Sequence, residues 1–306
     1  MATYPAEPVL VLEGGGMRGV YTSGVLEALA ESKRIRFAQI VACSAGACAA
    51  ASYLAGQPER NRRVYLDFLD GDKLVRFRRL LRGGSIMDID YLAFDVTLRL
   101  CPLDIDALRE SETRLHLGVT DWNTGEARYL TNHEDDIVTA LRATCALPFF
   151  YRGEVFYQGS RYVDGGVSDP VPIRKALTLG AREIVVVLTS SIESRAQERF
   201  APGLAFLFSS SSAIRRALRE RHHRYREAAE LTRSPPSGVR IRVIRPTARL
   251  PVTRTTTDRR LLEQGCDLGY EDGRRFVQQM FDSEQSDQRS LTRTEESSSG
   301  RKLSET

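Results

Sequence analysis

A short apolar run that leads into a glycine-rich loop constrains the fold more than any other stretch of the chain. Residues 9–12 read VLVL, residues 13–19 read EGGGMRG, and apolar residues at helical spacing follow from Val20. Four consecutive apolar residues bounded by a turn are typical of a buried strand. The stretch therefore predicts a strand, a tight turn and a helix, the repeating unit of a parallel α/β sheet.

The same alternation of strand and helix continues along the chain. Residues 37–43 predict a second buried strand, and 44–56 an alanine-rich helix that ends at Gly56. A hairpin is expected near Gly125. Further strands are predicted at 114–121, 126–131, 154–164, 183–190 and 239–246, with helices at 135–142 and 172–179. We therefore expect a mainly parallel sheet with helices on both faces.

One domain over residues 1–282 accounts for these elements. Within it, residues 192–232 form an arginine-rich insertion that is expected to be helical. Residues 283–306 have almost no apolar content, so we expect a disordered polar tail. No internal repeat is evident.

Composition excludes several classes of protein. The chain has 306 residues, with 44 basic and 40 acidic ones, and a net charge of +4 is too small to indicate a nucleic-acid partner. Its five cysteines form no C-x-x-C pair, so neither a metal site nor a disulfide framework is expected, and a reduced cytoplasmic setting is favoured. There is no signal-peptide pattern and no apolar run of about 18 residues. We expect a soluble protein that can still make peripheral contact with a membrane.

The glycine loop can hold a negative charge. Gly14, Gly16 and Gly19 fit the G-x-G-x-x-G pattern of dinucleotide-binding turns. That function also needs an acidic residue after the second strand, and residues 37–52 contain none. Converging amides at a helix N-terminus could instead bind a phosphate or the oxyanion of an attacked carbonyl. The alternative is that the glycine loop is only a tight strand-to-helix turn and binds no anion.

A candidate nucleophile lies after the second strand. Residues 42–46 read ACSAG, which resembles the G-x-S-x-G elbow with Ala42 in place of the first glycine. Ser44 would then lie on a sharp turn at the carboxyl end of the sheet, beside the glycine loop. The alternative makes Ser44 an ordinary helix N-cap. Cys43 is a rival nucleophile, but as the last strand residue it should point away from the turn and be inert.

The candidate base is an aspartate. None of the four histidines (His116, His133, His222 and His223) lies in a loop with the usual features of a catalytic histidine. Asp164 ends a predicted strand and is followed by Gly165 and Gly166, which leave its carboxylate exposed at the end of the sheet. A partly desolvated carboxylate has a raised pKa and can accept a serine proton. An ordinary Asp-Gly turn is the alternative.

Together, GGGMRG, ACSAG and DGG resemble the signature of the patatin-like phospholipase family, in its order and at its separations. The stretch ATCALPFFY at 143–151 is also similar, and the resemblance spans residues 8–282, most closely to bacterial members with a single catalytic domain. It implies a three-layer α/β/α fold in which Ser44 is the nucleophile and Asp164 the base. It also implies an oxyanion hole at Gly15, Gly16, Met17 and Arg18, with Gly14, Gly19, Gly46, Gly165 and Gly166 as elbow and motif glycines.

The expected function is a serine acyl hydrolase that cleaves fatty-acyl esters of phospholipids or lysophospholipids through an acyl-enzyme, without a metal or cofactor. A general carboxylesterase or thioesterase with soluble substrates is the alternative, and a non-catalytic anion-binding protein is the third. We expect residues 200–208 to form a lid or membrane-touching edge, or else to pack in the core. Arginines of the insertion would face lipid headgroups or solvent: Arg215, Arg216, Arg219 and Arg221.

Overall fold

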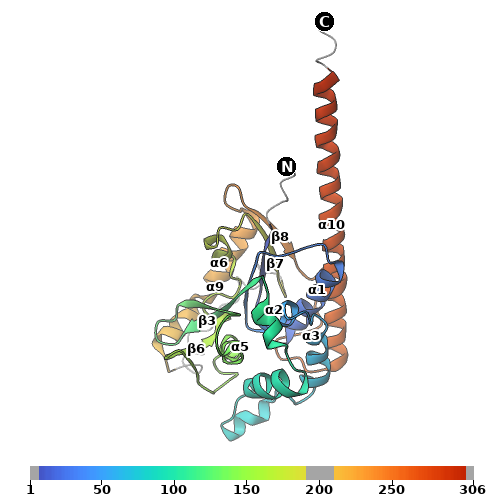
Figure 1. Ribbon diagram of the computed structural model, residues 1–306. Helices are drawn as coiled ribbons and strands as arrows, with labels where there is room; N and C mark the ends of the chain where they lie inside the picture. Colours follow the sequence, from blue (N-terminus) through green and yellow to red (C-terminus); the bar gives the residue numbers. More distant parts are fainter. Residues whose placement is uncertain (1–6, 191–209, 301–306) are drawn as a thin grey trace.

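The computed structural model of the chain describes residues 7–190 and 210–300 (Figure 1). Its centre is an eight-stranded sheet in the order β5-β6-β3-β2-β1-β7-β8, with β4 paired to β3. The strands are β1 (Val9–Leu12), β2 (Gln39–Cys43), β3 (Arg114–Asp121), β4 (Ala127–Thr131), β5 (Val155–Tyr157), β6 (Ser160–Asp164), β7 (Glu183–Val187) and β8 (Arg240–Ile244). β1, β2, β3, β7 and β8 run parallel, and the rest pair antiparallel. The mainly parallel sheet is therefore confirmed.

Helices cover both faces of the sheet. They are α1 (Gly19–Ser32), α2 (Ala45–Leu54), α3 (Arg60–Arg63), α4 (Ile105–Glu110), α5 (Ile137–Cys145), α6 (Ile173–Thr178), α9 (Ser212–Arg233) and α10 (Arg259–Gly300). Shorter turns of 3-10 helix are η1 (Gly16–Arg18), η3 (Phe77–Arg82) and η5 (Gly165–Val167), and π-helical segments are η2 (Val64–Phe68) and η4 (Tyr91–Leu100).

Side chains that alternate along β1 assign these helices to layers. Leu10 and Leu12 belong to a buried cluster with residues of α1, α2, α5 and α10. Val9 and Val11 belong to a second cluster with residues of α6 and α9. Because neighbouring residues of a strand point to opposite faces, the sheet lies between two helical layers. This is the predicted three-layer α/β/α fold, with α10 packed outside α1 (Figure 1).

One predicted strand is wrong. Residues 154–164 form two strands, β5 and β6, instead of one, and the two pair antiparallel. The break falls at Gln158 and Gly159, whose φ angles are 47° and 77°. Two consecutive residues with positive φ make the tight hairpin turn whose twist matches that of paired strands. The hairpin near Gly125 is confirmed, since β3 and β4 pair antiparallel.

α1 and α10 approach unusually closely because glycines lie between them. A Cβ atom placed on Gly24 would come within 2.0 Å of the Cys266 carbonyl oxygen, and one on Gly269 within 2.0 Å of the Tyr21 carbonyl oxygen. The Tyr21 hydroxyl also donates to Asp272 of α10 at 3.0 Å. This interface fixes the helix that begins at the glycine loop.

The last helix, α10, reaches into the segment that the sequence predicts to be a polar tail. α10 continues through residues 283–300 and extends well past the sheet (Figure 1). Its packed first half removes the cost of nucleation, so that each further residue can extend the helix. Within the described residues, no helix is both long enough and apolar enough to cross a membrane. The expected lid at 200–208 lies outside the described residues.

Candidate active site

Three chain segments that carry candidate site residues meet at the carboxyl edge of the sheet. The glycine loop leaves β1 and Ser44 leaves β2, and these parallel strands are paired with Leu12 opposite Ala42. Asp164 ends β6, which pairs with β3 next to β2. The order of strands thus brings together residues that lie 120 positions apart.

Ser44 and Asp164 are in direct contact. The Ser44 hydroxyl donates a hydrogen bond to Asp164 Oδ2 at 2.7 Å. Ser44 has φ 53° and ψ −132°, and its side chain makes no capping hydrogen bond to α2. Ser44 thus occupies the N-cap position of α2 without capping the helix through its side chain, and it lies on a sharp strand-to-helix turn. Such backbone strain in a non-glycine residue is often found at functional sites.

Small residues and one threonine shape this turn. A Cβ atom on Gly46 would lie 2.8 Å from the Glu13 carbonyl oxygen, so no larger residue fits there. The Ser44 amide donates to the hydroxyl oxygen of Thr144 at 2.8 Å. Thr144 belongs to the ATCALPFFY stretch, but its role could not be inferred from the sequence. This sharp turn forms with Ala42 in place of the first glycine of the G-x-S-x-G pattern.

Asp164 is buried, with 3% of its surface exposed. Burial raises the pKa of its carboxyl, because a charged group loses hydration there. Hydrogen bonds from Ser44 and from the Gly166 amide (2.7 Å to Oδ1) oppose that rise in pKa. The positive charges of Arg221 and Arg254 oppose it too. The carboxyl is thus held in place, yet it accepts a proton more readily than an exposed aspartate.

Two amides of the glycine loop are already engaged. The Met17 amide donates to the Arg254 carbonyl at 3.1 Å, and the Arg18 amide to the Gly15 carbonyl at 3.3 Å. In the described part of the chain, the amides of Gly15 and Gly16 donate no hydrogen bond. Of the four residues predicted for an oxyanion hole, these two have amides that could take a ligand. The contact from Arg254 had no signal in the sequence.

Arg18 does not line the cavity that the glycine loop borders. Its buried guanidinium lies 3.7 Å from Glu13 in an ion pair. Glu13 Oε2 also accepts hydrogen bonds from the amide (2.7 Å) and the hydroxyl (3.0 Å) of Thr189, and Oε1 one from Tyr225 (3.2 Å). This buried cluster supports the loop from beneath. Arg18 therefore helps to hold the loop and does not face a ligand.

A cavity of about 410 Å³ opens beside Ser44 and Asp164. One end is polar, bordered by the glycine loop, the two candidate catalytic side chains, Arg221 and Arg254. The rest is mainly apolar, with walls that include Leu69, Leu74, Met87, Ile89, Leu92 and Leu141. A cavity of this shape fits an acyl chain whose polar end lies at the serine. Arg221 thus borders the cavity, and its Nε also donates a hydrogen bond to the Gly166 carbonyl.

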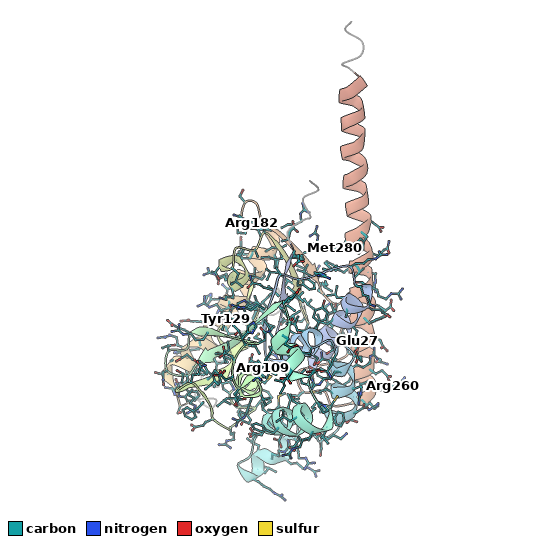
Figure 2. The ribbon with its side chains drawn as sticks, viewed as in Figure 1. Glu27, Arg109, Tyr129, Arg182, Arg260 and Met280 are labelled. Carbon is teal, nitrogen blue, oxygen red and sulfur yellow. The ribbon has the colours of Figure 1, made fainter. Side chains whose placement is uncertain are left out.

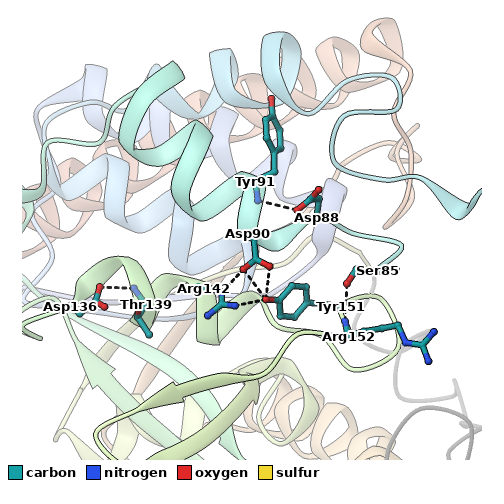
Figure 3. Close-up of polar contacts among 9 residues, drawn as sticks. All are labelled: Ser85, Asp88, Asp90, Tyr91, Asp136, Thr139, Arg142, Tyr151 and Arg152. Atoms are coloured by element: carbon teal, nitrogen blue, oxygen red, sulfur yellow. Dashed lines mark hydrogen bonds and ion pairs between the residues drawn. The ribbon is translucent and has the colours of Figure 1, made fainter. Parts of the chain in front are cut away.

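Residues 147–150 form one wall of this cavity. A polar cluster of Asp90, Arg142 and Tyr151 adjoins this wall, because Tyr151 follows it directly in the chain (Figure 3). The Tyr151 hydroxyl donates to Asp90, and Arg142 Nε donates to the same carboxylate at 2.6 Å. Arg142 Nη2 in turn donates to the Tyr151 hydroxyl at 2.6 Å. Phe149, within the wall, has φ 75°, which is rare for an aromatic residue. The cluster ties this wall to α5 and to the start of η4.

The rival groups lie outside this arrangement. No histidine borders the cavity in the described part of the chain, and burial lowers the pKa of His116 to about 4. Cys43 is fully buried, and burial raises the pKa of its thiol, so it is a poor nucleophile. Cys48 and Cys145 both border the cavity, with their sulfur atoms 3.5 Å apart. Among the described residues, no group of side chains could hold a metal ion.

Comparison with known proteins identifies the family. The family model described as patatin-like phospholipase matches residues 10–177, more than half of the chain. The chain belongs to the patatin-like phospholipase family. This membership confirms the resemblance drawn from the three motifs, and it places the chain among lipid acyl hydrolases in general. A second model, a domain of unknown function (DUF6363), matches residues 211–284.

Relatives of this patatin-like chain include bacterial and mammalian proteins. The uncharacterized protein YjjU of Escherichia coli is 28% identical over 247 residues, which is 79% of this chain and 69% of YjjU. The human 1-acylglycerol-3-phosphate O-acyltransferase PNPLA3 is 31% identical, over 55% of this chain and 36% of that protein. Among solved structures, VipD from Legionella pneumophila aligns with a TM-score of 0.49 and 15% identity, over 90% of this chain and 68% of VipD.

Proposed function

We propose that the protein is a serine acyl hydrolase that cleaves fatty-acyl esters of phospholipids or lysophospholipids. The observation that carries this proposal is the 2.7 Å hydrogen bond from the Ser44 hydroxyl to Asp164 Oδ2, at the polar end of an apolar cavity. A nucleophile and a base within hydrogen-bond reach are what covalent acyl transfer requires.

In the proposed mechanism Asp164 is the base both when the acyl-enzyme forms and when water hydrolyses it. Ser44 Oγ attacks the ester carbonyl carbon while Asp164 Oδ2 takes its proton. The amides of Gly15 and Gly16 donate to the alkoxide that forms, because they make no other hydrogen bond among the described residues. Collapse of this intermediate expels the alcohol, which takes the proton from Asp164. Water then gives one proton to Asp164 and attacks the acyl carbonyl carbon. When this second intermediate collapses, the fatty acid is released and Asp164 returns that proton to Ser44 Oγ, which restores both residues.

Two features favour a phospholipid over a soluble ester. The apolar walls of the cavity would bind a long acyl chain, and the positive charges of Arg221 and Arg254 lie at its polar end, near Asp164. A phosphate next to the scissile ester would complement those charges. A general carboxylesterase or thioesterase remains the alternative. The five free cysteines support a reduced cytoplasmic setting, which we also propose.

Acyl-chain length separates these two functions. For a series of lysophospholipids that differ only in chain length, kcat/KM is expected to rise about fourfold for each added methylene until the chain fills the cavity, since each buried CH₂ contributes about 0.8 kcal/mol. Initial rates of fatty-acid release, measured below the critical micelle concentration, give this dependence. Matched esters without a phosphate are the control. A flat response to chain length, with equal rates on both series, would favour the soluble-ester alternative.

The pH dependence tests Asp164 as the base. Only the charged carboxylate accepts the proton, so kcat/KM should fall as the pH is lowered through the pKa of Asp164, which burial raises above its ordinary value. The charge of Arg221 lowers that pKa, so the variant Arg221→Gln is expected to move the acid limb to higher pH. Arg226→Gln, an exposed change in the same helix, is the control and should leave the limb in place. If the acid limb of the kcat/KM profile lay at the same pH in Arg221→Gln as in wild type, Asp164 would not be the base.

A further inference from the structure

Exposed apolar side chains gather on one end of the molecule. Seven large hydrophobic side chains are exposed in the described part of the chain, and six of them lie on η3 and η4. Leu81 is 89% exposed and Phe77 59%. We call this surface the apolar tip; its six residues are Phe77, Leu80, Leu81, Phe94, Leu98 and Leu100. In Figure 1 it is the lowest part of the fold, coloured as residues near 80 and 95.

The apolar tip also carries positive charge that no described residue neutralises. Residues 73–85 include five basic residues and no acidic one. Three of the five form ion pairs with nearby aspartates. Arg78 and Arg82 are exposed, and neither has an ion-pair partner in the parts of the chain that the structure describes.

A further arginine lies beside this segment. The Arg152 amide donates to the Ser85 hydroxyl oxygen at 3.0 Å, and its exposed side chain extends away from the polar cluster (Figure 3). Exposed aromatic and aliphatic residues beside unpaired arginines are typical of surfaces that lie in the headgroup region of anionic membranes. Large exposed apolar side chains that gather at one end of a fold often mark an interaction site.

The apolar tip connects to the cavity through its own chain. Val75 and Met87 pair as an isolated antiparallel bridge, which closes the loop that carries η3. Leu74 and Met87, at the base of this loop, border the cavity, as does Leu92 of η4. Elements that present apolar residues to the outside therefore also wall the space that leads to Ser44.

We propose that the apolar tip docks on the surface of an anionic lipid bilayer. Phe77, Leu80 and Leu81 enter the boundary between headgroups and acyl chains, while Arg78 and Arg82 pair with lipid phosphates and carboxylates. This inference adds a binding surface to the proposed function, and docking does not require turnover. It can be measured in Ser44→Ala, so failure of the docking and failure of the hydrolase are distinguishable.

Vesicle cosedimentation tests the docking surface. The Ser44→Ala protein is expected to bind phosphatidylcholine vesicles that contain phosphatidylserine, and to bind pure phosphatidylcholine far more weakly. Arg78→Gln/Arg82→Gln should lower partitioning onto the anionic vesicles about thirtyfold, because each basic residue near such a surface contributes about fivefold to binding. Phe77→Ser/Leu81→Ser should lower partitioning onto vesicles of both compositions.

Matched controls keep this test specific. Arg114→Gln/Arg182→Gln removes two exposed arginines at the amino ends of β3 and β7, and Figure 2 shows Arg182 at the opposite end of the fold from the apolar tip. This control should bind as Ser44→Ala does. Phe156→Ser, which removes the exposed phenylalanine on β5, should also leave binding unchanged. The proposal would be overturned if both tip variants bound vesicles as well as Ser44→Ala does, or if the arginine control lost as much binding as Arg78→Gln/Arg82→Gln. It would also be overturned if Ser44→Ala itself bound no vesicles.

Discussion

Replacing Ser44 with alanine is expected to remove turnover of every acyl ester the protein accepts. The side chain is the only group in the proposed mechanism that forms a covalent bond to the substrate. Loss of such a nucleophile lowers kcat by on the order of 10⁴-fold or more. Fatty-acid release by the purified variant measures this effect directly.

Labelling by a fluorophosphonate gives a second readout for Ser44. The reagent should modify wild type and fail to modify Ser44→Ala. Cys43→Ser is the matched control, because Cys43 is the neighbouring residue and is fully buried, and it should retain the label. Labelling that survives in Ser44→Ala but disappears in Cys43→Ser would show that Cys43, and not Ser44, is the nucleophile.

Asp164→Asn should resemble Ser44→Ala in turnover, because the amide can no longer accept the serine proton. Since the two residues act as a unit, the double variant should be hardly less active than either single one. Additive losses would show that the two residues act independently, contrary to the hydrogen bond between them.

The largest effect on stability is expected at Gly269. A leucine there would bring its Cβ within 2.0 Å of the Tyr21 carbonyl oxygen, so α10 would have to separate from α1. Overpacking of this kind costs about 3 kcal/mol or more. For a chain of this size that lowers Tm by about 5–10 °C. Thermal unfolding followed by circular dichroism measures the change.

The control for Gly269→Leu is Gln264→Leu, which introduces the same side chain on the exposed face of the same helix. Its free energy of unfolding should stay within about 0.5 kcal/mol of wild type, as is usual for surface changes. If both variants melted together with wild type, the close approach of α1 and α10 would be refuted.

The local patterns located the main parts of the site well. A buried strand followed by small residues indicates a tight turn, and this sufficed to place the glycine loop and Ser44 at the same edge of the sheet. Asp164 was found in the same way, from a strand that ends in Asp-Gly-Gly. Each of these signals lies within a few consecutive residues, so it can be read without knowing the fold.

Other contacts between distant segments, beyond that of Ser44 with Asp164, could not be predicted. The bond from the Met17 amide to the Arg254 carbonyl joins residues that no local pattern relates, and it removes one of the expected oxyanion donors. The packing of α5 beside α2 likewise brings Thr144 to the Ser44 amide and the free thiol of Cys145 next to that of Cys48. The hairpin turn at Gln158 was missed because glutamine rarely adopts positive φ.

The carboxylate of Glu13 has a consequence for how the chain can be divided. It belongs to the segment matched by the patatin-like model, yet its donors Thr189 and Tyr225 lie beyond residue 177, and Tyr225 falls within the second match. A fragment that ends at residue 177 would remove the Thr189 and Tyr225 donors from this buried charge and would lose the parallel strands β7 and β8. We therefore propose that the two matched regions are halves of one cooperative folding unit, inseparable by proteolysis or by gene truncation.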